Sequence, residues 1–425
     1  MSSDSISPID GRYRKEAEPL ARFFSDRALA SARIEVEVAY LALLVGLGVA
    51  PRGRIPRIST DMAALERLEA KLGHDMKAVE VYIRESLQRG GSSKLAPFVH
   101  LGLTSEDTNS LAFAILLKSA IKGVLIPTYA SLATRVAAVA EKEASTAMVA
   151  RTHGRPAVPT TFGKEMGVFA YRLAERVAYI GRQTPMAKFS GAVGTYASFG
   201  LLADIDWPSE LSKFVATFGV EAAPYSTQVV PGERLSDIIH GVINVNQLIS
   251  SLAKDLWLYQ TLDYVHFLRP GKVSSSTMPQ KENPVDLENA EGQADVSNSL
   301  LVMIAYRMQQ TRLQRDLSDS VVRRMIGQAL AHSLVACKRL SGSLDAMKVE
   351  RSTMLSDLRA HPEVLAEREQ VVRRLEGHAR GYEEVRSSVK SGRFSADVSP
   401  TSYLGRSTEL AKGSGRAARK MLGSR

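Results

Sequence analysis

The residues best suited to chemistry lie in one segment, Lys272–Pro284, which reads KVSSSTMPQKENP. It joins a hydroxyl-rich loop to a helix start, since Asn283 and Pro284 are typical of an N-cap and a first helical position. Ser275, Lys281, Asn283 and Glu288 then fall within roughly two helical turns, where an ammonium and a helix N-terminus both favour an anion. A serine anion or a reacting carboxylate gains the same stabilisation. A mobile linker before an ordinary capped helix fits the same residues.

Three histidines stand in polar surroundings: His74 next to Asp75, His100 at the start of HLGLTSED, and His153 within RTHGRP. A histidine titrates near neutral pH and can give or take a proton. Taken singly, a hydrogen-bonded structural role explains each of them better.

The segment Arg312–Arg324 holds four arginines and two aspartates. Guanidinium forks bind carboxylates and phosphates in bidentate fashion. A helix surface with ion pairs is the alternative, and by itself it is the better explanation.

Long helices are expected to position these segments. Helical patterns cover about 21–47, 61–89, 129–149 and from about 160, and strand signals are weak. The clearest pattern lies in 233–263, where apolar residues repeat every three or four positions, the spacing of a helix packed along others. They are Leu235, Ile238, Val242, Val245, Ile249, Leu252, Leu256 and Tyr259. We predict an all-α protein with a helical domain at 1–103, a long-helix bundle at 104–345 and a helical domain at 346–425.

Composition narrows the class of protein. The chain has 425 residues, a formal net charge of +10 and one cysteine, Cys337, which fits a reducing cytosol. The N-terminus lacks the apolar core of a signal peptide, and the longest apolar run that we identify, 38–50, is too short to cross a bilayer. No zinc-ligand spacing, phosphate loop or dinucleotide fingerprint is visible. The basic tail at 411–425 is expected to be solvated; the charge would also suit nucleic acid.

Six segments together resemble one family in order along the chain. They are 7–13 (SPIDGRY), 100–107, 151–156, 190–194, 274–288 and 315–324. They are similar to the motifs of the adenylosuccinate lyases, within the fumarase, aspartase and argininosuccinate lyase superfamily. The resemblance spans about 6–406. The serine-rich loop is typical of the superfamily, and SPIDGRY and RDLSDS point to this member.

The resemblance implies a fold and a reaction. The fold is a homotetramer around a twenty-helix core with active sites shared between subunits. The reaction is a β-elimination, without metal or organic cofactor, that releases fumarate from adenylosuccinate or from the succinyl-carboxamide ribotide of purine synthesis (SAICAR). The products are AMP and the carboxamide ribotide (AICAR). The enzyme would be cytoplasmic, with no nucleic-acid or membrane partner.

The resemblance also assigns roles. Ser275 would be the base and His153 the acid, Glu288 would orient His153, and Lys281 and Asn283 would stabilise the carboxylate and the serine anion. The residues implied in substrate binding are Arg12, Tyr13, His74, Asp75, His100, Thr104, Ser105, Gln228, Arg315, Ser320 and Arg324.

Two positions depart from the family pattern. The family usually has glycine at Ser274 and often histidine at Gln280, and glutamine there also resembles argininosuccinate lyases. Two alternatives therefore stand beside the main interpretation. One is a sister lyase acting on another succinyl-amine such as argininosuccinate, and the other is a catalytically idle structural protein on this fold.

Overall fold

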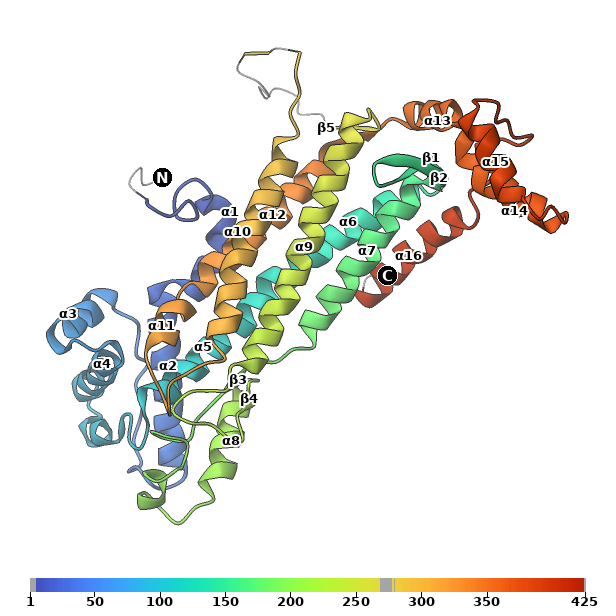
Figure 1. Ribbon diagram of the computed structural model, residues 1–425. Coiled ribbons are helices and arrows are strands. Elements are labelled where there is room, and N and C mark those ends of the chain that lie inside the picture. Colours follow the sequence, from blue (N-terminus) through green and yellow to red (C-terminus); the bar gives the residue numbers. More distant parts are fainter. Residues whose placement is uncertain (1–4, 268–276, 279, 424–425) are drawn as a thin grey trace. The chain divides into compact units, whose positions relative to one another are not determined.

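The computed structural model describes residues 5–267, 277–278 and 280–423. Helices dominate this part of the chain and the strands are short (Figure 1), which confirms the all-α prediction. The chain forms two compact units, each built from three segments. Unit 1 contains Met1–Pro127, Ile180–Ile243 and Val296–Leu334, and unit 2 contains Thr128–Tyr179, Asn244–Asp295 and Val335–Arg425. The three sequential domains stay a prediction, because these units group segments by contact rather than by chain order.

The predicted long helix is confirmed as α9 (Glu233–Thr261). Six of its eight patterned residues are buried, and Ile239, Leu248 and Ala253 are buried beside them. The buried stripe is therefore wider than a narrow coiled-coil seam, because α9 packs against more than one neighbour. Other long helices are α6 (Ile126–Lys142), α7 (Phe162–Gly181), α10 (Val285–Arg307) and α12 (Ile326–Ala346).

Two expected helices at the start of unit 1 are each divided into two. The pattern at 21–47 holds α1 (Arg14–Phe24) and α2 (Asp26–Gly46), and Ser25 between them accepts the N–H of Ala28 at 3.2 Å. The pattern at 61–89 holds α3 (Met62–Leu72) and α4 (Asp75–Arg89), which pack side by side (Figure 1). Gly73, at φ +64°, ends α3, and the Nδ1 atom of His74 caps α4. The apolar period continues across both breaks, so periodicity missed them.

The core of unit 1 is aromatic. Tyr40 of α2 lies 5.4 Å from Phe189 between ring centroids, and Phe189 lies 5.0 Å from Phe214. Phe214 belongs to α8 (Trp207–Thr217), and α5 (Ser105–Ala120) packs against α2 on the same core. A short parallel pair of strands, β3 (Met186–Ala187) and β4 (Glu221–Ala222), packs on this core. Helix α11 (Ser318–Arg323) also belongs to unit 1. These rigid elements carry the loops described below.

Unit 2 contains a β-hairpin where the sequence predicted a helix. The helix expected over 129–149 ends with α6 at Lys142, and β1 (Ala147–Thr152) then pairs antiparallel with β2 (Arg155–Thr161). Val149 of β1 packs on Leu358 of α13 (Arg351–Ala360) in a small apolar cluster. A second antiparallel pair joins β5 (Val265–Phe267) to β6 (Met347–Val349). Tertiary pairing overrode the helical pattern here.

The C-terminal region is more ordered than expected. Helices α14 (Ala366–Leu375) and α15 (Gly381–Lys390) pack side by side (Figure 1), and the basic tail forms α16 (Ser407–Met421). Ala411, Gly415 and Ala418 of α16 are buried, and Arg419 pairs with Glu141 of α6. The expectation of a solvated tail is therefore wrong, because its small residues form a packing face.

One apolar helical stretch, Ser105–Lys142, has the length and the mean hydropathy, 1.7, of a membrane span. It covers α5, a π-helical turn at Ile121–Leu125, and α6. Leu111, Leu125 and Leu132 within it are fully buried in the protein. Such packing is the pattern of a core helix.

The start of α7 tests how tightly unit 2 is packed. A Cβ atom added to Gly163 would lie 2.6 Å from the Cα of Ala144 and closer still to backbone atoms of Ala140 and Glu143. Backbone cannot yield as a side chain does, so Gly163→Ala should lower the free energy of unfolding by about 1–3 kcal/mol. Gly413→Ala in α16 has open space around the new methyl group and should raise it by up to about 1 kcal/mol. Scanning calorimetry of both variants checks this; equal melting temperatures would contradict it.

Candidate active site

A pocket of about 630 Å³ lies within unit 1. Its walls come from the α1–α2 junction, the α3–α4 junction, the first turns of α5, the loop at Gln228 and residues 315–324. This size suits a small organic ligand. Five stretches that are far apart in sequence thus meet around one cavity.

The pocket gathers most of the predicted substrate-binding residues. Eight of the eleven line it: His74, Asp75, Thr104, Ser105, Gln228, Arg315, Ser320 and Arg324. These residues are far apart in the sequence and were grouped only by resemblance to a family. The fold brings them to one cavity.

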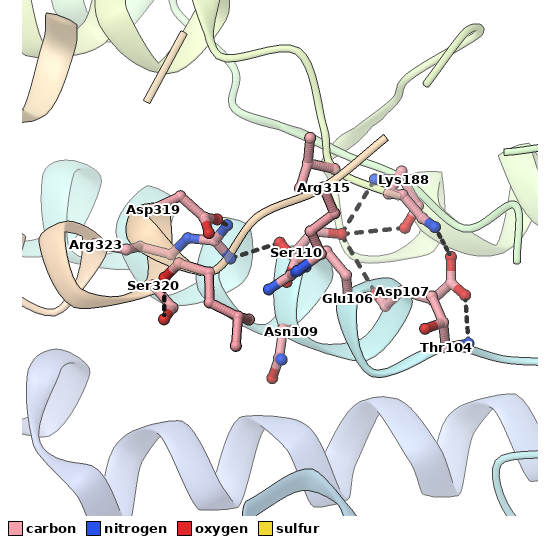
Figure 2. A network of polar contacts seen from close by, with 12 residues as sticks. Thr104, Glu106, Asp107, Asn109, Ser110, Lys188, Arg315, Asp319, Ser320 and Arg323 are labelled. Carbon is pink, nitrogen blue, oxygen red and sulfur yellow. Dashed lines mark hydrogen bonds and ion pairs between the residues drawn. The ribbon is translucent and has the colours of Figure 1, made fainter. Parts of the chain in front are cut away.

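Two adjacent acids in the first turn of α5, Glu106 and Asp107, organise the pocket wall (Figure 2). Their side chains are 2% and 0% exposed, so each carboxylate must find its partners inside the protein. Asp107 accepts the backbone N–H of Thr104 at 2.8 Å, as in a capping box. Its other oxygen lies 3.0 Å from the Nζ atom of Lys188, which is also fully buried. Burial raises the pKa of Asp107 and lowers that of Lys188, and the pair opposes both shifts.

Glu106 faces arginines instead. Its Oε2 atom lies 2.9 Å from Nη1 of Arg315, and its Oε1 atom lies 2.7 Å from Nη1 of Arg323. Arg323 also pairs with Asp319, one helical turn away in α11, at 2.6 Å. Burial alone would raise the pKa of Glu106, but Arg323 and Arg315 outweigh it and hold the pKa below its usual range.

A second group of charges lies where α4 begins. Arg33 of α2 donates to Asp75 at 2.7 Å and to Asn109 of α5 at 2.8 Å. Burial would raise the pKa of Asp75, but Arg33 lowers it overall. Arg324 approaches the same carboxylate only to 3.6 Å, and its side chain is 61% exposed. Arg324 therefore presents a cation to the pocket that is weakly neutralised by the protein.

Three predicted binding residues do not line this pocket. His100 points into unit 1, where its Nδ1 atom lies 2.7 Å from Glu37. Burial lowers the pKa of His100, yet Glu37 outweighs burial and the pKa is raised. Arg12 and Tyr13 precede α1, whereas Phe23 and Phe24 at its other end line the pocket. The length of α1, about 16 Å, separates the two ends.

Some pocket residues escaped the sequence analysis. Arg33 and Asn109 line the cavity and were not predicted, and Arg323 was predicted only as one of the four arginines of 312–324, with no role of its own. One signal was available: Arg33 and Glu37 are charged residues four apart on the apolar face of α2, whereas Glu35 between them lies on the exposed face. Such a spacing on a buried helix face indicates partners inside the fold.

The predicted acid, His153, belongs to unit 2. His153 and Gly154 are the two central residues of the β1–β2 turn, with φ of +53° and +75°, as a type I′ turn requires. The side chain of His153 is exposed at the hairpin tip. Arg151, two residues earlier, donates to Asp357 of α13 at 2.8 Å and fixes the base of the hairpin. The turn thus presents the imidazole to solvent on an anchored support.

Three more predicted catalytic residues, Lys281, Asn283 and Glu288, also belong to unit 2. Glu288 lies in the first turn of α10 and accepts the indole N–H of Trp257 at 3.3 Å. The helix begins at Val285, so Asn283 and Pro284 directly precede it. Lys281 is exposed. Among the described residues no hydrogen bond or ion pair joins Glu288 to His153, and Ser275 lies outside those residues.

The chemistry that the described residues offer is ionic. Within the described ranges, no three His, Cys, Asp or Glu side chains gather as metal ligands would. The pocket instead combines guanidinium groups, hydroxyls and a helix start, which together recognise phosphate and carboxylate groups.

The Glu106 carboxylate should be required for stability above acidic pH. Glu106→Gln leaves two arginines without their shared buried partner, so the free energy of unfolding in urea should fall by about 3–5 kcal/mol. Because the folded-state pKa is lowered, the contribution of Glu106 is complete above its unfolded pKa and is lost as pH falls through the folded value. The gap between wild type and variant should therefore shrink below about pH 4. Glu409→Gln, in an exposed pair with Arg406, is the control and should change little; a gap that stays constant down to pH 3 would contradict the assignment.

Comparisons with known proteins agree with the six motifs. Residues 11–296 match the family described as Lyase, and residues 311–400 match the family described as Adenylosuccinate lyase C-terminal. An adenylosuccinate lyase from Legionella pneumophila (strain Corby) is 32% identical, covering 96% of this chain and 98% of its own. One from Escherichia coli (strain K12) is 32% identical, covering 93% and 91%, and one from Dictyostelium discoideum is 33% identical, covering 91% and 88%.

Solved structures agree on the fold. The 3-carboxy-cis,cis-muconate lactonizing enzyme of Pseudomonas putida superposes with a TM-score of 0.78 at 19% identity, covering 95% of this chain and 97% of its own. A fumarate lyase from Mesorhizobium sp. BNC1 gives 0.73 at 18% identity, covering 96% and 98%. With both halves of the sequence matched and relatives above 30% identity along nearly the whole length, the chain belongs to the adenylosuccinate lyase family.

Proposed function

We propose that this chain is a carbon–nitrogen lyase that cleaves adenylosuccinate to AMP and fumarate, and SAICAR to AICAR and fumarate. The observation that carries the proposal is the convergence of eight of the predicted substrate-binding residues on one pocket in unit 1. Each substrate has one phosphate and two carboxylates, and guanidinium groups such as those of Arg315 and Arg324 bind both kinds of anion.

The binding roles follow the chemistry of each side chain. Arg315, Ser320 and Arg324, with Arg12 and Tyr13, bind phosphate and carboxylate oxygens. Thr104, Ser105 and Gln228 hold the succinyl group. His74 and Asp75 lie at the start of α4, where an anion is favoured, and His100 completes the predicted set.

The elimination moves two protons. Ser275 takes the proton from the carbon next to a carboxylate, and the electron pair of that C–H bond forms the double bond of fumarate. The C–N bond breaks, and His153 gives its proton to the departing nitrogen. Lys281 and Asn283 stabilise the carboxylate as its negative charge grows, and Glu288 orients His153. Serine is a weak base in water, so closure around Ser275 must exclude solvent.

The working enzyme is a homotetramer whose active sites are shared between subunits, and it is cytoplasmic. The binding residues belong to unit 1, and those catalytic residues that the structure describes belong to unit 2. Helix α9, with 29 residues and a length of about 44 Å, stands between Gln228 and Lys281 along the chain. Neighbouring copies in a closed assembly can supply both sets to one site. The single cysteine, Cys337, is buried, which suits a reducing compartment.

Substrate choice tests the proposal directly. Purified enzyme incubated with adenylosuccinate should release fumarate and AMP, followed by absorbance and chromatography. Argininosuccinate has a guanidino group and no phosphate, so it leaves the arginines without their anion and should not be cleaved. Fumarate release from argininosuccinate at a comparable kcat/KM would instead favour the sister lyase, and no release from any of the three substrates would favour an idle structural protein.

The shared site can be tested with two inactive variants. Ser275→Ala and His153→Ala should each lower kcat about a thousandfold or more, because acid–base groups act in the transition state. If the two residues of one site come from different chains, tetramers reassembled from equal amounts should regain about a quarter of wild-type activity. Mass spectrometry must show that subunits have exchanged. Exchange with no recovered activity would rule out the shared site, and a Ser275→Ala enzyme that keeps a tenth of its activity would move the base to Ser276.

A further inference from the structure

We propose that Lys188 and Asp107 are positioning residues that hold the dicarboxylate-binding half of the pocket, independently of the phosphate-binding half that Glu106 supports. The inference rests on the proposed function and assigns to this buried pair a role in substrate recognition. It predicts that the two halves of the pocket can be loosened separately.

Lys188 is held entirely by the protein. Its side chain is 0% exposed, and its ammonium group contacts the Asp107 carboxylate and the carbonyl oxygen of Gly191. Its backbone is fixed as well, because the Ser110 hydroxyl donates to the carbonyl of Lys188 at 3.1 Å and lies 3.2 Å from its N–H. A lysine with no exposure cannot itself touch a ligand in the pocket. Any effect of Lys188 on ligand binding must therefore act through the residues that it contacts.

Asp107 joins two loops. One oxygen accepts the N–H of Thr104, and the other accepts the N–H groups of Ser190 at 2.9 Å and Gly191 at 3.2 Å. The carboxylate therefore fixes Thr104 and Ser105, the proposed succinyl ligands, to the segment 190–194. That segment is one of the six family motifs, and no role was assigned to it above.

The connection continues to the third succinyl ligand. The hydroxyls of Ser190 and Ser226 lie 2.9 Å apart, and Ser226 is two residues before Gln228 in the same loop. Gly194, at φ +80°, approaches the same loop so closely that an added Cβ would lie 2.9 Å from the carbonyl carbon of Ser226. Thr104, Ser105 and Gln228 thus belong to one connected group of loops with Asp107 at its centre.

Glu106 belongs to a second group, which is joined to the first through the backbone of α5 and through the N–H of Gln228, which donates to the carbonyl of Gln314 at 3.3 Å. Successive helix residues point about 100° apart, so Glu106 faces Arg315 and Arg323 while Asp107 faces Lys188 (Figure 2). Arg315 and the exposed Arg324 are proposed anion ligands on that side, and this inference assigns the phosphate to them, because Thr104, Ser105 and Gln228 hold the succinyl group. Two neighbouring carboxylates therefore support two different sets of ligands.

A buried ion pair is seldom the most stable way to fill a core, because both ions lose their hydration. An apolar pair at these positions would pack, but it could not accept three backbone N–H groups from two loops. The geometry points to loop placement as the function of this pair.

The two reaction products report on the two halves. Fumarate carries the carboxylates and AMP carries the phosphate, so each serves as a competitive inhibitor of adenylosuccinate cleavage by the intact enzyme. Lys188→Met should raise the inhibition constant of fumarate by at least about tenfold and that of AMP by less than about threefold. Arg324→Ala is the matched control and should do the reverse, raising the constant for AMP more than that for fumarate.

A milder variant covers the case in which Lys188→Met does not fold. Ser110→Ala removes only the hydroxyl that fixes the Lys188 backbone, and it should raise the fumarate constant about threefold with the AMP constant unchanged. Equal increases for both products in either variant, or no increase for either, overturn the inference. A wild-type enzyme that releases no fumarate from adenylosuccinate overturns the proposed function and this inference with it.

Discussion

The burial of two adjacent carboxylates at the start of α5 constrains everything around the pocket. Neither Glu106 nor Asp107 can reach water, so each needs cations or N–H groups from other parts of unit 1. Those partners come from 188–191 and from 315–323, segments that lie far from α5 in the sequence. The contacts that join these segments of unit 1 therefore also form the wall of the pocket. A change that strengthens or weakens these contacts should therefore affect both the stability of unit 1 and the shape of the pocket.

The four arginines around the pocket have different roles, although they look alike in the sequence. Arg33 and Arg323 are largely buried and bound to acids, so their charge is neutralised within the protein. Arg315 is as little exposed as Arg323, at 16%, but it is bound to one acid, Glu106, where Arg323 is bound to two. Arg324 is the most exposed of the four and has only a long contact to Asp75. The capacity to attract an anionic ligand therefore rests mainly with Arg315 and Arg324, and the other two shape the cavity.

Unit 2 presents its chemical groups differently, by local backbone geometry. His153 sits in the turn of a hairpin, and the positive φ that this turn requires is favoured by the glycine that follows. The hairpin is secured by Arg151 on Asp357 and by apolar contacts of Val149 with α13. An exposed imidazole on a fixed turn is available to a ligand without a large rearrangement.

The sequence alone determined the helical class and the long helix α9, and the ordered motifs indicated the family. These depend on local spacing, because a period near 3.6 and an ordered set of motifs are visible without any contact. The prediction from sequence failed where a helix ends, or a strand pairs, without a change in that spacing. It missed the caps at Ser25 and His74, which are local but interrupt an apolar period that continues across them. It also missed the hairpin at 147–161 and the packed tail α16, which depend on partners elsewhere in the fold. Only the tertiary structure decided which charges are buried and which are offered to a ligand. Arg323 and Arg324 are neighbours in the sequence, and the first binds Glu106 inside the protein while the second faces the pocket, because burial is a property of the assembled fold.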